Sequence, residues 1–505
     1  MTFLAPTFSP AAATLTDEQA TAVDLACTLA PGAGLRVRAG AGTGKTSTLR
    51  AMAAALAPLR GIYLAFNRTV AEAARATFAG APCRPMTFHG LCLSAATPVM
   101  SGGPVRYDVR ADIIDAGLLA RHRRAIPSDW SEFGVALAAM RTFEAFTMSA
   151  AREIGANHAR AAIVAATGDP DTLVAAGPRR RAARAIAVLS PVLVEIATAF
   201  WVARLADRRF SHDAYVKLVQ LDPDLAARAF ADADYAMVDE AQDMSPVQVA
   251  ILRNAGIRVI AVGDSAQSIF GWRGAVDALD RFPGATATLS RSFRFGPDIA
   301  AMANRVLDAT PGVRLEGIGG AADADSFAIL ARSNLGLIDE AEALHARGVA
   351  FHLDRAEDLV GQIASARALR GGRRAAVTAP EIRPFRTWHD LAEQAEADGT
   401  LARIVQIVDE GRAESVASLA RASRAPDAAR VHLMTAHRAK GLEFGHVKLA
   451  EDWSDLGELR DRYEKVGGLS AGARIAAQQE FNTLYVAVTR AIHRVVGAET
   501  CLGGV

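Results

Sequence analysis

The chain has 505 residues, of which 51% are hydrophobic and 22% are charged, and its 56 Lys and Arg nearly balance its 55 Asp and Glu. This length allows more than one domain and a large buried core, which excludes a peptide, a fibre and a disordered scaffold. A formal net charge of +1 provides no global polybasic field for a nucleic acid or a membrane, so any polyanion has to be bound in a local groove.

The cysteines form no CxxC pair and no short, even framework, which is typical of structural thiols in a reducing cytosol. They are Cys27, Cys83, Cys92 and Cys501. The N-terminal segment has no basic start and no sustained apolar stretch, and no run of about 18 uncharged apolar residues occurs. We therefore expect a cytoplasmic protein without a membrane partner. The histidines form no cluster with cysteines, so a structural zinc is not expected.

Short apolar runs rich in β-branched residues recur along the chain, and each is followed by a longer amphipathic segment. In chain order they are residues 35–39, 62–66, 235–238, 259–262, 326–330, 431–435 and 447–449. Strands that alternate with helices predict parallel sheets joined by right-handed crossovers. The predicted fold class is therefore α/β.

The predicted strands fall into two groups, and each group is interrupted by a helical stretch. We expect a first nucleotide-binding domain from residues 1–97 and 232–290, with residues 98–231 as a helical insertion. A second domain of the same kind is expected from residues 291–350 and 429–505. Its insertion, residues 351–428, is shorter.

A glycine-rich segment at 39–46, AGAGTGKT, lies between a predicted strand and a helical pattern. In this setting the glycines let backbone N–H groups surround phosphates, Lys45 reaches the β and γ oxygens, and the Thr46 hydroxyl can ligate Mg²⁺. Ala39 replaces the glycine that opens the general pattern, but the strand–loop–helix order is kept. The residues expected to bind a nucleoside triphosphate here are Gly42, Gly44, Lys45 and Thr46.

A second segment, YAMVDE at 235–240, is an apolar strand that ends in two acids. Such a strand beside a phosphate loop can give Asp239 to the magnesium ion and Glu240 to the attacking water. The two segments together predict an NTPase that uses Mg²⁺.

Further segments follow in a fixed order, from LTDEQ at 15–19 to Glu480 with YVAVTRA at 485–491. Between them lie DEAQD at 239–243, VGDSAQSIFGWRG at 262–274, SFRF at 292–295 and TAHRAKGLEF at 435–444. Over nearly the whole chain they resemble the motifs of superfamily 1 helicases of the UvrD/Rep type, especially the core of F-box DNA helicases. The resemblance implies two RecA-like P-loop domains with parallel sheets, each carrying a mainly helical insertion.

The resemblance also implies an ATP site shared by the two domains. Gln19 would read adenine, Phe293 would stack on it, and Glu443 would hold the ribose. The γ-phosphate would be met by Gln267, Arg294 and Arg490. An arginine that arrives from a second domain can be worth roughly 10³ to 10⁵ in rate, so closing the domains would complete the catalytic site around Lys45 and Glu240.

A DNA strand would lie across the same two domains. The resemblance implies that it is contacted by Phe66, Asn67, Phe88, His89, Trp272, Arg273, Arg332, Asn334, Thr435 and His437. Aromatic faces stack on bases without sequence preference, which suits a protein that moves over any sequence. Arginine-rich segments at 121–124 and 179–181 either engage duplex phosphates or form solvated helical faces.

The resulting expectation is an ATP- and Mg²⁺-dependent DNA helicase and translocase, moving 3′ to 5′ on single-stranded and forked DNA in repair, recombination or replication. The short second insertion and the end of the sequence soon after Arg490 favour little more than a motor core. They also leave a second hypothesis, an ATP-switched DNA-binding subunit of a regulatory or defence system without processive unwinding. An RNA-directed motor is a third, because stacking and backbone contacts discriminate poorly.

Overall fold

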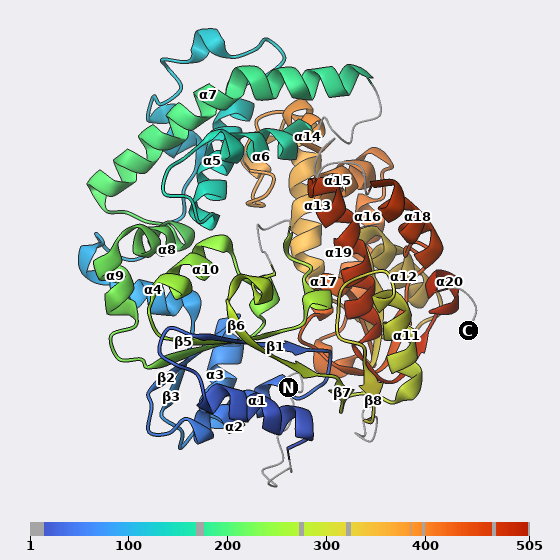
Figure 1. Ribbon diagram of the computed structural model, residues 1–505. Helices are drawn as coiled ribbons and strands as arrows, with labels where there is room; N and C mark the ends of the chain where they lie inside the picture. The colour runs from blue at the N-terminus through green and yellow to red at the C-terminus, as the bar shows by residue number, and fades with distance from the viewer. Residues whose placement is uncertain are drawn as a thin grey trace.

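The computed structural model describes residues 15–167, 176–271, 277–319, 325–383, 385–395, 399–466 and 471–502. Two sheets organise this part of the chain, one in each lobe of the molecule (Figure 1), and the strand pairs within them are parallel. The α/β prediction with two parallel sheets is confirmed.

The first sheet has six strands in the order β3-β2-β4-β5-β1-β6. Its strands are β1 (Gly34–Ala39), β2 (Gly61–Ala65), β3 (Cys83–Thr87), β4 (Tyr235–Val238), β5 (Arg258–Gly263) and β6 (Gly284–Leu289). The second sheet has five strands in the order β10-β11-β9-β12-β13. They are β9 (Phe327–Ala331), β10 (Phe351–Leu353), β11 (Val431–Thr435), β12 (Phe444–Leu449) and β13 (Ala491–Val496). A small ribbon pairs β7 (Arg291–Ser292) with β8 (Glu316–Gly317).

Four strands of the two sheets escaped the sequence prediction, and all of them lie at a sheet edge. The edge strands β3 and β6 read as Cys-Arg-Pro-Met-Thr and Gly-Ala-Thr-Ala-Thr-Leu, which lack a continuous apolar run. One edge strand of the second sheet, β13, carries exposed polar residues in its middle. The fourth, β10, lies inside the predicted insertion 351–428 but pairs with β11, so the second insertion begins after Leu353.

Helices of the first domain cover its sheet, and the stretch between β3 and β4 is helical in its described part. The first domain contributes α1 (Asp17–Cys27), α2 (Lys45–Ala55), α3 (Arg68–Thr77), α4 (Phe88–Ala96) and α10 (Pro246–Asn254). The insertion contains α5 (Glu132–Met148), α6 (Ala156–Thr167), α7 (Ala176–Asp207), α8 (His212–Leu221) and α9 (Pro223–Ala229). Within α7, Arg179–Asp207 is long and apolar enough to cross a membrane by length and composition, but half of its most apolar window is buried inside the protein.

The second domain is arranged in the same way. Its helices are α11 (Pro297–Leu307), α12 (Asn334–Ala346), α17 (Ala436–Ala439), α18 (Leu456–Val466), α19 (Ala471–Val488) and α20 (Glu499–Leu502). Its insertion holds α13 (Ala356–Arg370), α14 (Trp388–Ala395), α15 (Gly399–Asp409) and α16 (Ala413–Ala422). Figure 1 shows this insertion beside the helices of the first one, and Phe133 packs against Phe385 with ring centroids 6.1 Å apart.

The parallel strands bring distant segments to one edge of the first sheet. The glycine-rich loop follows β1, the paired acids follow β4, and the short 3₁₀ turn η5 (Ser265–Gln267) follows β5. Because β1, β4 and β5 are neighbours in the sheet, these three loops meet where the strands end. Helix α19 of the second domain packs against η5 and faces the same edge.

Candidate nucleotide site and strand interface

The glycine-rich loop has the local geometry of a phosphate cradle. Gly42 and Gly44 have φ values of 74° and 77°, a left-handed conformation that glycine adopts without steric cost. Helix α2 begins at Lys45, so its N-terminal N–H groups open into the loop. A Cβ on Gly42 would lie only 2.5 Å from Ser292 Oγ, so the second domain approaches this loop closely.

Gln19 and Phe293, the two residues expected to contact adenine, both lie beside the loop. Gln19 Nε2 donates to the Thr43 carbonyl at 3.3 Å. Its Oε1 accepts from the Thr16 N–H, and this bond is half of the capping box that starts helix α1. The Phe293 N–H donates to the Gly42 carbonyl at 2.9 Å, and its side chain is 48% exposed. An exposed ring at this position is free to stack on a planar group held next to the loop.

The two acids after β4 are half-buried, and the charge of Lys45 in the loop acts on both. Asp239 accepts hydrogen bonds from the Tyr63 hydroxyl at 2.6 Å and from the Glu240 N–H at 3.0 Å. Burial and the neighbouring Glu240 raise the pKa of Asp239. Burial would also raise the pKa of Glu240, but the positive charges of Lys45 and Lys440 and the hydrogen bond from Gln242 lower it instead. Glu240 is therefore the carboxylate that the site keeps charged.

These residues fit a magnesium ion by their chemistry. Hard cations such as Mg²⁺ prefer carboxylate and hydroxyl oxygens, and a nucleotide-bound Mg²⁺ in related folds uses one carboxylate and the hydroxyl that follows the loop lysine. Asp239, directly after β4, and Thr46, in the first turn of α2, could supply those two oxygens.

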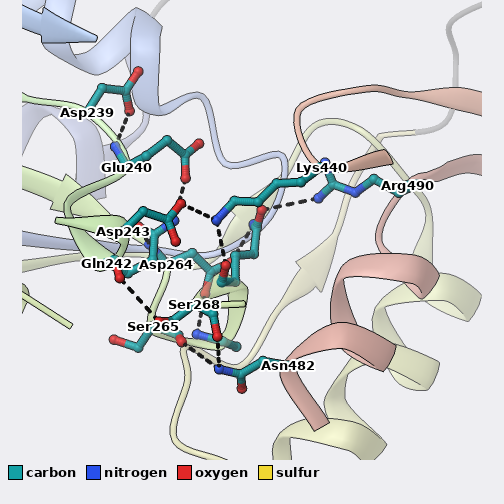
Figure 2. A network of polar contacts seen from close by, with 12 residues as sticks. Asp239, Glu240, Gln242, Asp243, Asp264, Ser265, Ser268, Lys440, Asn482 and Arg490 are labelled. Atoms are coloured by element: carbon teal, nitrogen blue, oxygen red, sulfur yellow. Dashed lines mark hydrogen bonds and ion pairs between the residues drawn. The ribbon is translucent and has the colours of Figure 1, made fainter. Parts of the chain in front are cut away.

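The second domain contributes Arg490, which is buried between the domains. Its guanidinium donates to Gln267 Oε1 at 3.3 Å and to the carbonyls of Val486 and Leu442 at 3.0 and 3.3 Å. Burial, followed by the charge of Arg294, lowers the pKa of Arg490 to about 9. Figure 2 shows Arg490 and Lys440 reaching from the second domain toward the loops of the first. Gln267 and Arg490, both expected to meet the γ-phosphate, are in contact with each other in the structure.

Arg294 is also at this seam, and it is held by an acid of its own domain. Its Nε donates to Glu443 Oε1 at 2.8 Å and its Nη1 donates to the Thr489 carbonyl at 2.8 Å. The backbone of Arg294 faces Gly42, at whose position a Cβ would lie 2.7 Å from the Arg294 Cβ. Glu443, expected to hold a ribose, has its carboxylate engaged by Arg294 in this arrangement.

The sequence motifs suggested no role for Lys440, a residue of the second domain that contacts two residues of the first. It forms a buried ion pair with Asp243, and its Nζ donates to the Gln267 carbonyl at 2.6 Å. The ammonium also lies 5.1 Å from the centre of the Phe270 ring. Asp243 Oδ1 is buried and has no hydrogen-bond partner among the described residues. The sequence signal for this pair is that Asp243 and Lys440 carry opposite charges in motifs of different domains, DEAQD at 239–243 and TAHRAKGLEF at 435–444.

An aromatic group lies on the surface next to this seam. Phe66 is 48% exposed and stacks on Phe270, with ring centroids 5.6 Å apart and an angle of 14° between the rings. Phe270 is also 6.4 Å from the ring of His437. Burial and the charge of Arg332 lower the pKa of His437 to about 4, so this imidazole is neutral at physiological pH. Phe66, Phe270 and His437 thus form a continuous aromatic platform from both domains.

One of the expected strand contacts, Phe88, needs correction, and another, Asn67, has a structural role in the free protein. Phe88 is only 6% exposed and packs in the core of the first domain with Leu91 and Leu64, so its ring has no free face for a base. Asn67 is exposed, but its side chain accepts from the Val70 N–H at 2.8 Å and caps helix α3. Trp272 and Arg273 lie outside the described residues.

The other expected strand contacts lie at the surface or near it. His89 is within 3.3 Å of Asp213, and Arg332 forms an ion pair with Glu480 of α19. Thr435 is half-buried at the end of β11, and Asn334 is exposed at the start of α12. Arg332, Thr435 and His437 sit at the ends of adjacent strands β9 and β11, on the same edge of the second sheet.

The fold is that of a two-domain P-loop protein, and the glycine-rich loop of the first domain faces residues of the second. Residues 173–279 match the model of the UvrD/REP helicase N-terminal domain. F-box DNA helicase 1 of Gallus gallus is 29% identical over 497 residues, covering 90% of this chain and 46% of the relative. F-box DNA helicase protein 1 of Schizosaccharomyces pombe is 27% identical over 540 residues, covering 96% and 57%. DNA helicase II of Escherichia coli is 40% identical over 82 residues, 14% of this chain.

These matches confirm the resemblance to superfamily 1 helicases of the UvrD/Rep type that the motifs indicated. The chain spans about half the length of the curated F-box helicase relatives that it matches.

Proposed function

We propose that this chain is an ATP-dependent DNA translocase and helicase that moves 3′ to 5′ along single-stranded DNA. The observation that carries the proposal is the buried seam where Arg490 and Lys440 of the second domain meet Gln267 and Asp243 of the first. A nucleotide held at such a seam couples its own hydrolysis to domain movement, because both domains contact it.

The chemistry proposed for this seam is ATP hydrolysis. Lys45 and the loop N–H groups would bind the phosphates, and Glu240, kept ionised by its cationic neighbours, would accept a proton from the attacking water. Bound Mg²⁺, held by Thr46 and Asp239, would neutralise phosphate charge. Arg294 and Arg490 would offset the charge that develops on the γ-phosphoryl oxygens.

The movement proposed for the strand uses the aromatic platform of Phe66, Phe270 and His437. These rings come from both domains, so a change in the spacing of the domains would change the spacing of the rings. Stacking binds any base, which supports sequence-independent movement. The setting that we propose for this movement is DNA repair, recombination or replication in the cytoplasm.

The first test measures ATP turnover with no nucleic acid, single-stranded DNA, forked DNA and RNA. We expect single-stranded DNA to stimulate turnover. Lys45→Ala and Glu240→Gln should lower the stimulated rate by about a hundredfold or more while the melting temperature is retained. Near-normal turnover in either variant would refute the site. If only RNA stimulates turnover, the strand bound by this protein is RNA and not DNA.

The second test measures strand displacement on partial duplexes with a 3′ or a 5′ single-stranded tail. The 3′-tailed substrate should be unwound preferentially, and the opposite preference would overturn the polarity. DNA-stimulated turnover with no displacement of either substrate would instead support the ATP-switched regulatory or defence subunit.

A further inference from the structure

Besides Arg490, which follows helix α19, side chains of α19 itself contact the turn that follows β5. Asn482 Nδ2 donates to the carbonyl of Ser268 at 2.8 Å and to that of Ser265 at 3.3 Å. Its Oδ1 accepts from the Thr310 hydroxyl and from Gln478 Nε2 at 3.1 and 3.0 Å, so the amide is fixed in orientation. Figure 2 shows Asn482 pointing at the two serines.

One turn further along α19, Tyr485 is fully buried between the same turn and the phosphate loop. Its hydroxyl donates to Asp264 Oδ2 at 3.1 Å and accepts from the Ala41 N–H of the loop at 3.3 Å. Asp264 also accepts from Gln267 Nε2 at 2.7 Å and from the Ala266 N–H at 3.2 Å. A single hydroxyl from the second domain therefore joins the phosphate loop to the turn that carries Gln267.

Hydrogen bonds also connect this turn to Glu240, one of the two acids after β4. The Asp264 N–H donates to Gln242 Oε1 at 3.0 Å, and Gln242 in turn donates to Glu240. Buried hydrogen bonds of this kind are costly to leave unmade, so a displacement of one member shifts its neighbours. The connected set runs from Glu240 through Gln242, Asp264 and Tyr485 to Ala41.

From this set we infer that Tyr485 is a positioning residue that couples occupation of the phosphate loop to the position of the 264–271 segment. This inference rests on the proposed function, because it assigns the coupling between nucleotide and strand to one hydroxyl. When the loop binds a nucleotide and its N–H groups turn to phosphate, the Ala41 bond to Tyr485 changes. Asp264 and Gln267 then move, and with them Phe270 of the aromatic platform.

The decisive experiment is hydrogen–deuterium exchange of the full chain with and without ADP, aluminium fluoride and Mg²⁺. In the wild type we expect slower exchange both in peptides covering 39–46 and in peptides covering 264–271. Tyr485→Phe keeps the ring and removes only the hydroxyl. It should retain the slowing at 39–46 and lose most of it at 264–271.

A matched control is Tyr107→Phe in the first insertion. The Tyr107 hydroxyl also donates to a carbonyl, that of Arg209 at 3.1 Å, and accepts from a backbone N–H, that of Ser211 at 2.9 Å, but it lies far from the seam in the helical insertion. This variant should respond to the nucleotide like the wild type.

ATP turnover gives a second readout that a structural role alone would not produce. Tyr485→Phe should lower kcat at saturating single-stranded DNA by about tenfold, with a change in KM for ATP below about threefold, as expected for the loss of one bond to a charged group. Equal slowing at 264–271 in Tyr485→Phe and wild type would overturn the inference.

The outcomes also separate this inference from the proposed function. If the wild type shows coupled slowing that Tyr485→Phe loses, but no strand displacement, the coupling stands and the helicase assignment fails. If the wild type unwinds DNA and Tyr485→Phe does so at the same rate, the helicase assignment stands and the coupling role of Tyr485 is refuted. Absence of nucleotide-dependent slowing in the wild type contradicts both.

Discussion

At the scale of single residues, burial decides which of the many arginines has a specific role. Most arginines in ion pairs here are solvated, such as Arg314 with Asp308, and surface pairs of that kind contribute little. Arg490 is 1% exposed, and its Nε, Nη1 and Nη2 atoms donate to the Val486 carbonyl, the Leu442 carbonyl and Gln267 Oε1. A planar group held in this way cannot be replaced by another cation without loss of geometry.

We therefore expect Arg490→Lys to fail although it keeps the charge. Both Arg490→Lys and Arg490→Ala should lower DNA-stimulated kcat by about 10³-fold, the effect of losing an arginine finger, with a smaller change in KM for ATP. Steady-state ATP turnover and thermal melting would be measured together. Arg314→Ala, an exposed arginine of the same domain, is the control. Full activity of Arg490→Lys would show that charge alone suffices.

At the scale of elements, the ends of parallel strands explain why short motifs meet. Phe66 follows β2, Phe270 follows the turn after β5, and His437 lies in α17 directly after β11. None of these rings is near another in the sequence. The sheets place them together because all three strands end on the edges that face the seam.

Removal of one ring should weaken strand binding without affecting the nucleotide site. Phe66→Ala should reduce affinity for single-stranded DNA by about 1–3 kcal/mol, to a similar extent for pyrimidine-rich and mixed sequences. Fluorescence anisotropy with labelled oligonucleotides would measure this change. Val202→Ala truncates an apolar residue that is 58% exposed on α7 and should bind like the wild type. Unchanged affinity of Phe66→Ala would remove that ring from the strand path.

At the scale of the whole molecule, the domains are joined by a buried ion pair as well as by packing. The side chains of Lys440 and Asp243 are 8% and 0% exposed, so each charge is neutralised by its partner and not by water. Burial raises the pKa of Asp243 to about 6, and the charge of Lys440 opposes this rise. Loss of one partner of a buried pair commonly costs about 3–5 kcal/mol because the other charge is left unpaired.

Lys440→Met should therefore destabilise the protein in a pH-dependent way. Without Lys440 the pKa of Asp243 in the folded state rises further above its unfolded value of about 3.9, so the folded state binds the extra proton at low pH. Stability is then lost as pH increases from about 5 toward 8 until the folded carboxyl ionises. The melting temperature at pH 5 and pH 8 would test this. Lys448→Met, whose pair with Glu340 is within the second domain and more exposed, should show a smaller difference. An equal fall at both pH values would contradict the explanation.

The sequence by itself determined the α/β class, the phosphate loop and the acids after β4, because these depend on local periodicity and on glycines at fixed spacing. The ordered motifs also assigned Gln267 and Arg490 to one γ-phosphate, and the structure brings these two side chains into contact. The sequence missed the edge strands β3, β6 and β13, whose small or polar residues do not form an apolar run, and the edge strand β10, which has only three residues. The sequence motifs also predicted that Phe88 contacts DNA, although its ring is buried in the core of the first domain.

Only the tertiary structure decided how the second domain is attached to the first. The pair of Lys440 with Asp243 and the bonds of Tyr485 to Ala41 and Asp264 join residues about 200 or more positions apart. No local pattern specifies such contacts, because they arise from the order of strands in each sheet and from the burial of α19 against the turn after β5.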